Sequence, residues 1–325
     1  MATNPASVEQ PRRTIPAEMI EDARKHVYEA AIRTPLVRLN YDGPAEIYLK
    51  LECLQPIGAF KIRGAYNAVR LLPEDKRKLG VWTVSAGNAA QGVALAARRA
   101  GVPCKVLMIQ EAPAAKVDAV RRLGGEIVKA SYERCWVALE ERTYPGMDGT
   151  FVHPFEDDEF IAGNATAGLE IVEDLPEVDA IVASFGGGGL SSGIASGVRS
   201  RGSKAKVYAA EPETAAPLAR SFAMGSPQKF PEWRASFVDG SGGKSVFPRM
   251  WALVHHLLAG SIVCTLEETR QAMKIMAERN HVIAEGAGAC AVAAGLSGKA
   301  GTGKVVCVVS GGNIDLAKFA ELVSR

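Results

Sequence analysis

Two features of the sequence have residue types that could do chemistry: a lysine in an apolar setting and a loop of four consecutive glycines. Lys61 follows Ala59 and Phe60 in the stretch LQPIGAFKIRGAYNAV. It stands at the predicted start of a helix, where the helix dipole disfavours a cation. An amine buried next to Phe60 has a lowered pKa and is more nucleophilic. A lysine with its head in water is the commoner arrangement, so the interpretation depends on the second feature.

The second feature, SFGGGGLSSG, lies between the apolar run AIVAS and a helical pattern. A strand, a glycine loop and a helix N-terminus in this order direct backbone N–H groups at a phosphate. Two other phosphate motifs fail, because GKAGTGKV has Val305 in place of the metal-binding hydroxyl and GGKS has Val238 in place of the first glycine. No acidic ribose partner follows the loop in a nucleotide-binding context, so a nicotinamide oxidoreductase stays only as a rival hypothesis.

A phosphate loop combined with a desolvated lysine predicts a phosphorylated cofactor that reacts with an amine. Pyridoxal 5'-phosphate is such a cofactor, because its aldehyde forms an imine with a lysine side chain. The sequence offers no HExxH motif, no GxSxG nucleophile motif and no cluster of His and Cys at metal-binding spacing. Hydrolase and metalloenzyme functions therefore have little support, and we expect no metal site.

Four motifs in a fixed order resemble a known group of enzymes, and the resemblance covers nearly the whole chain. The group is the tryptophan synthase β-like, fold type II pyridoxal phosphate enzymes, and within it the threonine dehydratase and serine racemase family. The motifs are a lysine motif, a substrate-carboxylate loop, a phosphate cup and a C-terminal cofactor motif, which read here QPIGAFKIRGAY, SAGNAAQGVA, SFGGGGL and SGGNID.

The resemblance implies roles for the residues of these motifs. Lys61 would hold the cofactor and move the Cα proton of the substrate, and Phe60 would flank the cofactor ring. Asn88 would donate to the phenolic oxygen, and Ser310 would face the pyridine nitrogen. The phosphate would be bound by the backbone N–H groups of Gly186, Gly187, Gly188, Gly189 and Leu190. The substrate carboxylate would be bound by the loop of Ser85, Ala86, Gly87, Asn88 and Ala89.

Three further positions bear on the family's pattern. Glu285 resembles a glutamate near the cofactor, and a role as cap of the following helix is an equal alternative. Ala86 stands where serine racemases have a serine that acts on the opposite face of Cα, so racemisation is disfavoured. Glu211 matches the first ligand of the family's divalent-cation site, but Pro217 replaces a later acidic ligand. A weak or monovalent cation there stays an open alternative.

The function implied by the resemblance is the dehydration of a β-hydroxy-α-amino acid to a 2-oxo acid and ammonia. L-Threonine and L-serine are the first choices, and 3-hydroxyaspartate, phenylserine and a hydroxyectoine-derived amino acid are alternatives. A non-catalytic amino-acid-binding module is the alternative from another class, although the presence of Lys61 speaks against it. The segment Asp239 to Trp251 is expected to serve substrate selection or oligomer contacts.

The elements that position these residues follow from alternating apolar runs and Ala-rich segments. Short continuous apolar runs such as VWTVS, KVLMI, AIVAS and KVVCVVS, separated by helical patterns, are typical of parallel sheets covered on both faces. The fold class is therefore α/β, and the resemblance implies two open, mainly parallel sheets. We expect residues 80–149 to form a small mobile domain that binds the substrate carboxylate, inserted in a large cofactor domain of residues 1–79 and 150–325.

Composition limits the partners and the compartment. The chain has 325 residues, a formal net charge of +2 and no basic run, so nucleic acid is not an expected partner. No apolar stretch is long enough to cross a membrane, and no targeting segment is apparent at the N-terminus. Six scattered cysteines without a CxxC pair fit a reducing, cytoplasmic setting. A homodimer is expected, with the helical stretch MWALVHHLLAG as one face that could pack either on a partner or in the core.

Overall fold

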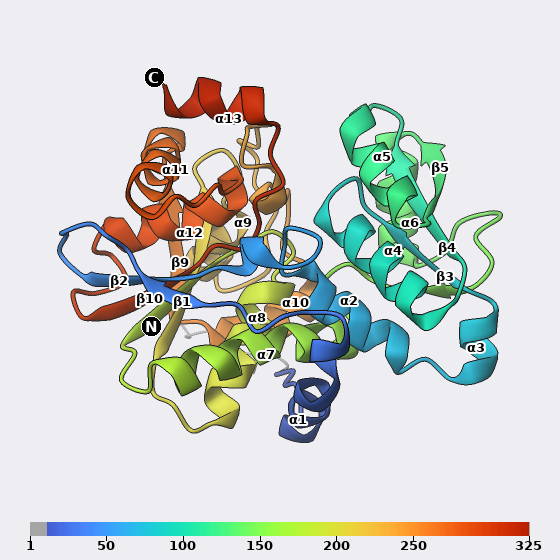
Figure 1. Cartoon of the computed structure of the whole chain (residues 1–325), viewed down its shortest axis with the longest axis horizontal. Coiled ribbons are helices and arrows are strands. Elements are labelled where there is room, and N and C mark those ends of the chain that lie inside the picture. Colours follow the sequence, from blue (N-terminus) through green and yellow to red (C-terminus); the bar gives the residue numbers. More distant parts are fainter. Residues whose placement is uncertain (1–11, 325) are drawn as a thin grey trace, which may run out of the picture.

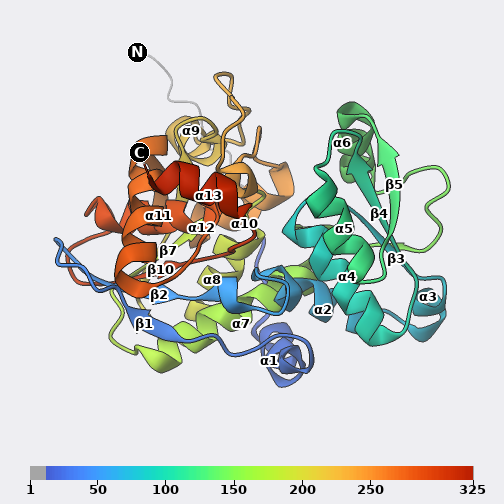
Figure 2. The ribbon, with the colours of Figure 1, turned by 45° about the horizontal axis from the view of Figure 1, so that its top comes forward.

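The computed structural model describes residues 12–324 and has two β-sheets in separate lobes (Figures 1 and 2). The larger sheet has the strand order β1-β2-β10-β7-β8-β9, and only the pair β1 and β2 is antiparallel. Its strands are β1 (Leu36–Arg38), β2 (Glu46–Lys50), β7 (Ala180–Ser184), β8 (Lys206–Pro212), β9 (Gly260–Cys264) and β10 (Lys304–Val308).

The smaller sheet has the order β5-β4-β3-β6 and is parallel throughout. Its strands are β3 (Val81–Val84), β4 (Cys104–Ile109), β5 (Glu126–Ala130) and β6 (Thr150–Phe151). Alternate residues of these strands belong to different cores: Val106 packs with the helices α4 and α5, whereas Leu107 packs with α6. The sheet is therefore covered on both faces, as the continuous apolar runs predict.

Thirteen α-helices and three short 3-10 helices are present among the described residues. The α-helices of the N-terminal half are α1 (Ala17–His26), α2 (Lys61–Arg70), α3 (Glu74–Lys78), α4 (Asn88–Ala100), α5 (Ala114–Arg122), α6 (Tyr132–Glu141) and α7 (Asp158–Asp174). The others are α8 (Gly189–Ser200), α9 (Pro217–Met224), α10 (Pro248–Leu257), α11 (Leu266–Asn280), α12 (Gly286–Leu296) and α13 (Leu316–Val323). The 3-10 helices are η1 (Val27–Glu29), η2 (Glu52–Leu54) and η3 (Asp239–Ser241).

Helices also cover both faces of the larger sheet. One core joins α7, α8 and α10 to alternate strand residues such as Ile181 and Val306. The other joins α11, α12 and α13 to the intervening residues such as Val182 and Val305. The predicted α/β class with two mainly parallel sheets is thus confirmed. The strands β1, β2 and β9 were not predicted individually, because their residues alternate in burial or are few and do not form a continuous apolar run.

Three helices of the larger lobe, α2, α7 and α8, pack with their backbones nearly in contact. Glycines make this possible: a Cβ on Gly168 of α7 would lie 2.5 Å from the carbonyl oxygen of Ile194 in α8. A Cβ on Gly163 would similarly collide with the carbonyl group of Arg63 in α2. Helix α2 also contacts α4 of the smaller lobe, so it lies at the junction of the two lobes (Figure 2).

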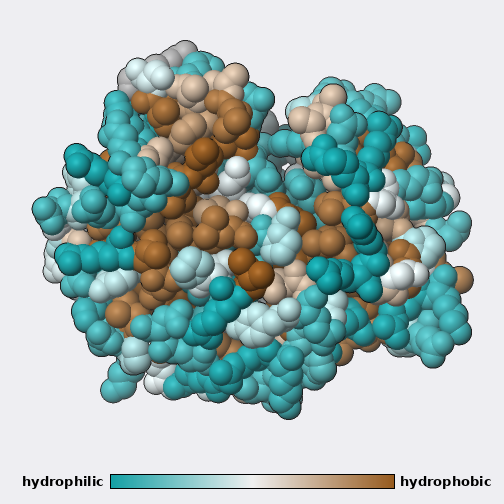
Figure 3. Space-filling view, in the orientation of Figure 1, coloured by the Kyte–Doolittle hydropathy of each residue, from teal (hydrophilic) through white to brown (hydrophobic). Residues whose placement is uncertain are grey.

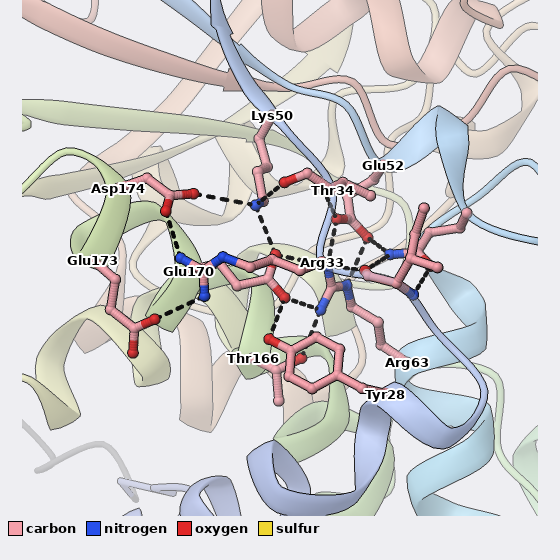
Figure 4. A network of polar contacts seen from close by, with 12 residues as sticks. Tyr28, Arg33, Thr34, Lys50, Glu52, Arg63, Thr166, Glu170, Glu173 and Asp174 are labelled. Carbon is pink, nitrogen blue, oxygen red and sulfur yellow. Dashed lines mark hydrogen bonds and ion pairs between the residues drawn. The ribbon is translucent and has the colours of Figure 1, made fainter.

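A buried network of charges connects α2 to α7 and β2 (Figure 4). The guanidinium of Arg63 donates to Glu52 at 2.7 Å and to Glu170 at 2.6 Å, and all three side chains are fully buried. Lys50 pairs with the second oxygen of Glu170 at 2.6 Å. Burial alone would lower the pKa of Arg63, but the two carboxylates outweigh it and raise that pKa. At the surface end of the network, Arg33 pairs with Glu173 at 2.9 Å.

Helix α10 resolves one alternative left open by the sequence. Met250, Leu253 and Val254 of the stretch MWALVHHLLAG are fully buried in the core of the larger lobe. This helix face therefore packs within the chain and is not available to a partner. Between residues 12 and 324, no helix combines the length and the apolar character that crossing a membrane requires.

Candidate active site

Lys61 is the first residue of α2, as predicted, and its amine faces a cavity between the two lobes. The Nζ atom donates to the carbonyl oxygen of Pro154 at 2.6 Å and lies 5.0 Å and 5.4 Å from the ring centres of Phe60 and Phe160. Burial among these groups lowers the pKa of Lys61 to about 7. At neutral pH an amine with this pKa is protonated much less than an ordinary lysine, which reduces the unfavourable interaction with the helix dipole.

This lowered pKa makes a testable prediction about Lys61 in protein kept free of carbonyl compounds. We expect acylation of Lys61 by a small reagent to have a pH midpoint near 7 instead of the ordinary lysine value of 10.5, because only the neutral amine reacts. The measurement is mass spectrometry of the peptide that contains Lys61 after brief labelling across a pH series. The other lysine peptides of the same digest are the control, and a midpoint for Lys61 that coincides with theirs would contradict the prediction.

The glycine loop connects β7 to the N-terminus of α8 in the predicted order. Gly188 has a φ of +91°, which favours glycine, and a Cβ on Gly187 would collide with the ring of Phe155. No hydrogen bond within residues 12–324 uses the backbone N–H groups of Gly186–Gly189. Unpaired N–H groups at a helix N-terminus are suited to bind an anion.

A second loop reaches the cavity from the smaller lobe, between β3 and α4. The N–H group of Gly87 donates to Oγ of Ser85 at 3.1 Å, which shapes the loop as a tight turn. Helix α4 begins at Asn88, so the N–H groups of its first turn have no carbonyl partner within the helix. The loop therefore offers an anion site that faces the glycine loop across the cavity.

The cavity has a volume of about 490 Å³ and brings nearly all the predicted residues together. The exceptions are Gly188, the N-cap of α8, and Gly189, its first residue, which do not line the wall. The predicted residues that do line it are Phe60, Lys61, Ser85, Ala86, Gly87, Asn88, Ala89, Gly186, Gly187, Leu190, Glu285 and Ser310.

A chain of hydrogen bonds joins Asn88 to the larger lobe. The Nδ2 group of Asn88 donates to Glu285 at 2.7 Å, and its Oδ1 accepts from Asn313 at 2.8 Å. Burial, with the nearby charge of Asp239, raises the pKa of Glu285 to about 7. Glu285 occupies the N-cap position of α12, but its side chain makes no capping hydrogen bond. The capping alternative for this carboxyl group is therefore wrong.

Sequence reasoning missed several residues of the site. Pro154 contributes only a backbone carbonyl, which has no signature in the sequence. Asn313 lies within the motif SGGNID, so its motif was recognised but its contact with Asn88 was not. His153 lies directly before Pro154, and its Nδ1 accepts the N–H of Glu156 at 3.0 Å. Burial lowers the pKa of His153 to about 2, so a neutral ring supports the turn that presents Pro154.

Two contacts join the lobes around the mouth of the cavity. Lys116 of α5 pairs with Asp239 of η3 at 2.8 Å. The Nζ atom of Lys244 lies 4.3 Å from the ring centre of Tyr132 in α6 and 4.2 Å from that of Trp233. The segment from Asp239 to Gly243 lines the cavity.

Glu211 is fully buried, but its carboxylate is occupied by neighbouring donors. It accepts the N–H groups of Leu218 and Ala219 at 2.8 Å each and the hydroxyl group of Ser261 at 2.6 Å. Burial raises the pKa of Glu211 to about 7. Across residues 12–324, no group of three or more His, Cys, Asp or Glu side chains is placed to hold a metal ion.

The cavity fits the cofactor that the sequence predicts. Pyridoxal 5'-phosphate requires a reactive amine, an anion cradle for its phosphate and space for a ring between them. These requirements are met by the amine of Lys61 with its lowered pKa, by the unpaired N–H groups of the glycine loop and by the 490 Å³ cavity. Ser310 lines the same cavity directly after β10 and could donate to a ring nitrogen.

Comparison with known proteins agrees with this geometry. A family model described as "Pyridoxal-phosphate dependent enzyme" matches residues 27–311. An L-threonine ammonia-lyase of Thermotoga maritima is 38% identical over 321 residues, covering 96% of this chain and 79% of that protein. A catabolic L-threonine dehydratase of Staphylococcus aureus is 34% identical over 320 residues, covering 94% of this chain and 91% of that protein. The solved structure of maize serine racemase has a TM-score of 0.87 at 32% identity, and the match covers 95% of this chain and 97% of that one.

Proposed function

The chain belongs to the family of pyridoxal-phosphate-dependent enzymes, and from this premise we propose that it is an ammonia-lyase that dehydrates β-hydroxy-α-amino acids. L-Threonine and L-serine are the first substrates to test, since two relatives are named for threonine. The observation that carries the proposal is the buried amine of Lys61, with a pKa lowered to about 7, in one cavity with the glycine loop and the loop that precedes α4. Family membership sets aside the nicotinamide oxidoreductase alternative, and the retained lysine argues against a non-catalytic binding module.

Each loop has a proposed role in holding the reactants. The N–H groups of Gly186–Gly189 and Leu190 bind the cofactor phosphate, and the loop of Ser85–Ala89 binds the substrate carboxylate. Asn88, held by Glu285 and Asn313, would donate from its amide to the cofactor's phenolic oxygen. Phe60 flanks the ring. The proposed small mobile domain is residues 80–149, which include the carboxylate loop, and the remainder of the chain would form the cofactor domain. The smaller sheet extends two residues past this predicted limit, through β6 (Thr150–Phe151).

The proposed chemistry divides between the cofactor and two side chains. The cofactor supplies an electron sink that acidifies the Cα–H bond of a bound amino acid. Lys61 would take the Cα proton of the bound amino acid, for which a pKa of about 7 is suitable at neutral pH. Ser310 would donate a hydrogen bond to the ring nitrogen without transferring a full proton, which would make the sink moderate. A moderate sink favours rapid loss of the β-hydroxyl group as water.

Ala86 bears on the choice between dehydration and racemisation. Racemisation requires an acid or base on each face of Cα, and the methyl group of Ala86 can supply neither. Maize serine racemase has a similar fold and is 32% identical, but this similarity does not supply an acid or base at the position of Ala86. We therefore assign dehydration as the main reaction.

The experiment that tests the proposal is addition of L-threonine to the purified, cofactor-loaded protein. We expect the visible absorption band of the lysine-bound cofactor to change and 2-oxobutyrate and ammonia to form in equal amounts. D-Threonine formation, followed by chiral chromatography, should be much slower. The proposal fails if neither L-threonine, L-serine nor any other β-hydroxy amino acid yields a 2-oxo acid.

Assembly and location complete the proposal. Leu54, Ile283 and Leu316 expose apolar side chains, and the segments carrying Leu54 and Ile283 meet around Gly312. Figure 3 shows hydrophobic residues gathered on the face of the larger lobe that is also seen in Figure 1. A homodimer would cover such a surface, and light scattering would measure its mass. The six free cysteines support a reducing cytoplasmic compartment.

A further inference from the structure

A second, smaller cavity lies next to the proposed carboxylate loop, within the smaller lobe. We call it the annex. It has a volume of about 140 Å³, and none of its lining residues carries a charged side chain. The lining residues are Val84, Ser85, Ala86, Leu107, Ile109, Tyr132, Cys135, Trp136 and Leu139.

The annex adjoins the main cavity. Five residues line both spaces, namely Val84, Ser85, Ala86, Ile109 and Leu139. Two of these, Ser85 and Ala86, belong to the loop that would bind the substrate carboxylate. Because the β-carbon of an amino acid is only two bonds from its carboxylate carbon, a substituent on that carbon is near the annex when the carboxylate is bound. The small side chain of Ala86 leaves room between the two spaces.

The walls of the annex are suited to an apolar group and not to a charged one. The indole N–H of Trp136 donates to Glu140 at 2.9 Å. Burial raises the pKa of Cys135, so its thiol stays neutral. A cavity of roughly 150 Å³ lined by apolar side chains is large enough to hold a benzene ring. The annex therefore matches an aryl group in both size and polarity.

We propose that the annex receives the β-substituent of the substrate, so that β-hydroxy-α-amino acids with an aryl or branched apolar substituent are substrates of this protein. This inference rests on the proposed function, because it concerns the same loop and the same reaction. A second carboxylate, as in 3-hydroxyaspartate, would require a cation. The annex has none, and Lys116 in the main cavity is paired with Asp239.

The reaction expected with L-threo-phenylserine balances without a further reactant. The Cα–H and Cβ–O bonds break, and the hydroxyl group leaves as water. The released enamine takes up water and loses ammonia, so one phenylserine gives one phenylpyruvate and one ammonia. The aromatic ring takes no part in these steps and serves only as the group that the annex recognises.

The kinetic test compares L-threo-phenylserine with L-threonine in the wild type and in two variants at one position. Cys135 lines the annex but not the main cavity. Cys135→Leu partly fills the annex, whereas Cys135→Ala slightly enlarges it. We expect wild-type kcat/KM for phenylserine to equal or exceed that for threonine. The ratio of kcat/KM for phenylserine to kcat/KM for threonine should fall about tenfold or more in Cys135→Leu. One methylene in an apolar pocket changes the discrimination between two substrates by about 10–200-fold. It should stay within about twofold in Cys135→Ala.

A binding measurement tests the same inference without turnover and without a variant. L-Phenylalanine and L-2-aminobutyrate are phenylserine and threonine without the hydroxyl group, so neither can be dehydrated. We expect calorimetry with the cofactor-loaded wild type to give a Kd for L-phenylalanine at least about tenfold lower than that for L-2-aminobutyrate. Cys135→Leu should remove most of that difference.

The possible outcomes separate the two proposals. If threonine is dehydrated but phenylserine is not, the annex does not receive the substituent and the ammonia-lyase proposal stands. If phenylserine is dehydrated but Cys135→Leu lowers both substrates equally, the ring lies elsewhere and the inference is overturned. If no β-hydroxy amino acid is dehydrated, the proposed function itself has failed. Should Cys135→Leu fail to fold, equal wild-type affinities for the two non-reactive amino acids would still overturn the inference.

Discussion

Replacement of Lys61 by alanine is expected to abolish turnover, lowering kcat/KM by about 10³-fold or more, the range in which a positioned general base contributes. The amine has two proposed tasks, holding the cofactor and moving the Cα proton, and alanine can do neither. Its surroundings provide no substitute: the nearest contacts of Nζ are the Pro154 carbonyl oxygen and two phenylalanine rings. The visible band of the lysine-bound cofactor should vanish, while the circular dichroism spectrum should remain that of the wild type.

A second lysine offers a matched control for this experiment. Lys116 also lines the main cavity, but it is paired with Asp239 at the mouth and does not contact the Lys61 amine. The variant Lys116→Ala should retain the absorption band. If Lys61→Ala kept the band and substantial activity, the assignment of Lys61 would be wrong, and another amine would have to hold the cofactor.

Replacement of Arg63 by alanine is expected to destabilise the fold by roughly 3–5 kcal/mol, the cost of removing one partner from a buried ion pair. The guanidinium is fully buried and bonds to the carboxylates of Glu52 and Glu170 (Figure 4). Without it, the buried carboxylate of Glu52 loses its ion-pair partner, and that of Glu170 keeps Lys50 at 2.6 Å and the nearby charge of Arg33. The urea concentration at the unfolding midpoint is the measurement, together with the slope of the transition.

Arg33 is the matched control because it belongs to the exposed end of the same network. Its side chain retains 42% of its surface and pairs with Glu173 and Asp174. An exposed pair contributes about 0–1 kcal/mol, so Arg33→Ala should shift the midpoint only slightly. Equal midpoints for the two variants would show that the buried pairs contribute no more than the exposed ones.

The sequence predicted the parts of the fold that depend on local patterns. Continuous apolar runs indicated the central parallel strands, because a strand buried on both faces has no polar alternation. The apolar neighbours of Lys61 indicated a neutral amine, and the structure attributes its lowered pKa to burial alone. The four glycines indicated a loop between a strand and a helix N-terminus, and the structure has this order, with the N–H groups of Gly186–Gly189 unpaired within residues 12–324.

Other parts of the site depend on contacts between distant segments, which local patterns do not encode. The carbonyl of Pro154 meets Lys61 from 93 positions away, and any residue type has a carbonyl. From the sequence, a place near the cofactor and a role as helix cap were equal alternatives for Glu285. The hydrogen bond from Asn88, which is 197 positions away, decides between them. The annex is formed by residues of β3, β4 and α6 and has no motif. The limits of the small domain stay a prediction.

The close packing of α2, α7 and α8, called here the helix stack, allows substrate range to change independently of the class of reaction. Lys61 begins α2, and the glycine loop leads into α8, so the stack keeps the amine and the phosphate site at a constant separation. Glycine contacts between backbones leave little tolerance for mutation there. The annex and Ser85–Ala89 lie outside the stack, where side chains can vary without moving it. Substrate range can therefore diverge under drift or selection, or be redesigned in the laboratory, while the class of reaction is inherited unchanged.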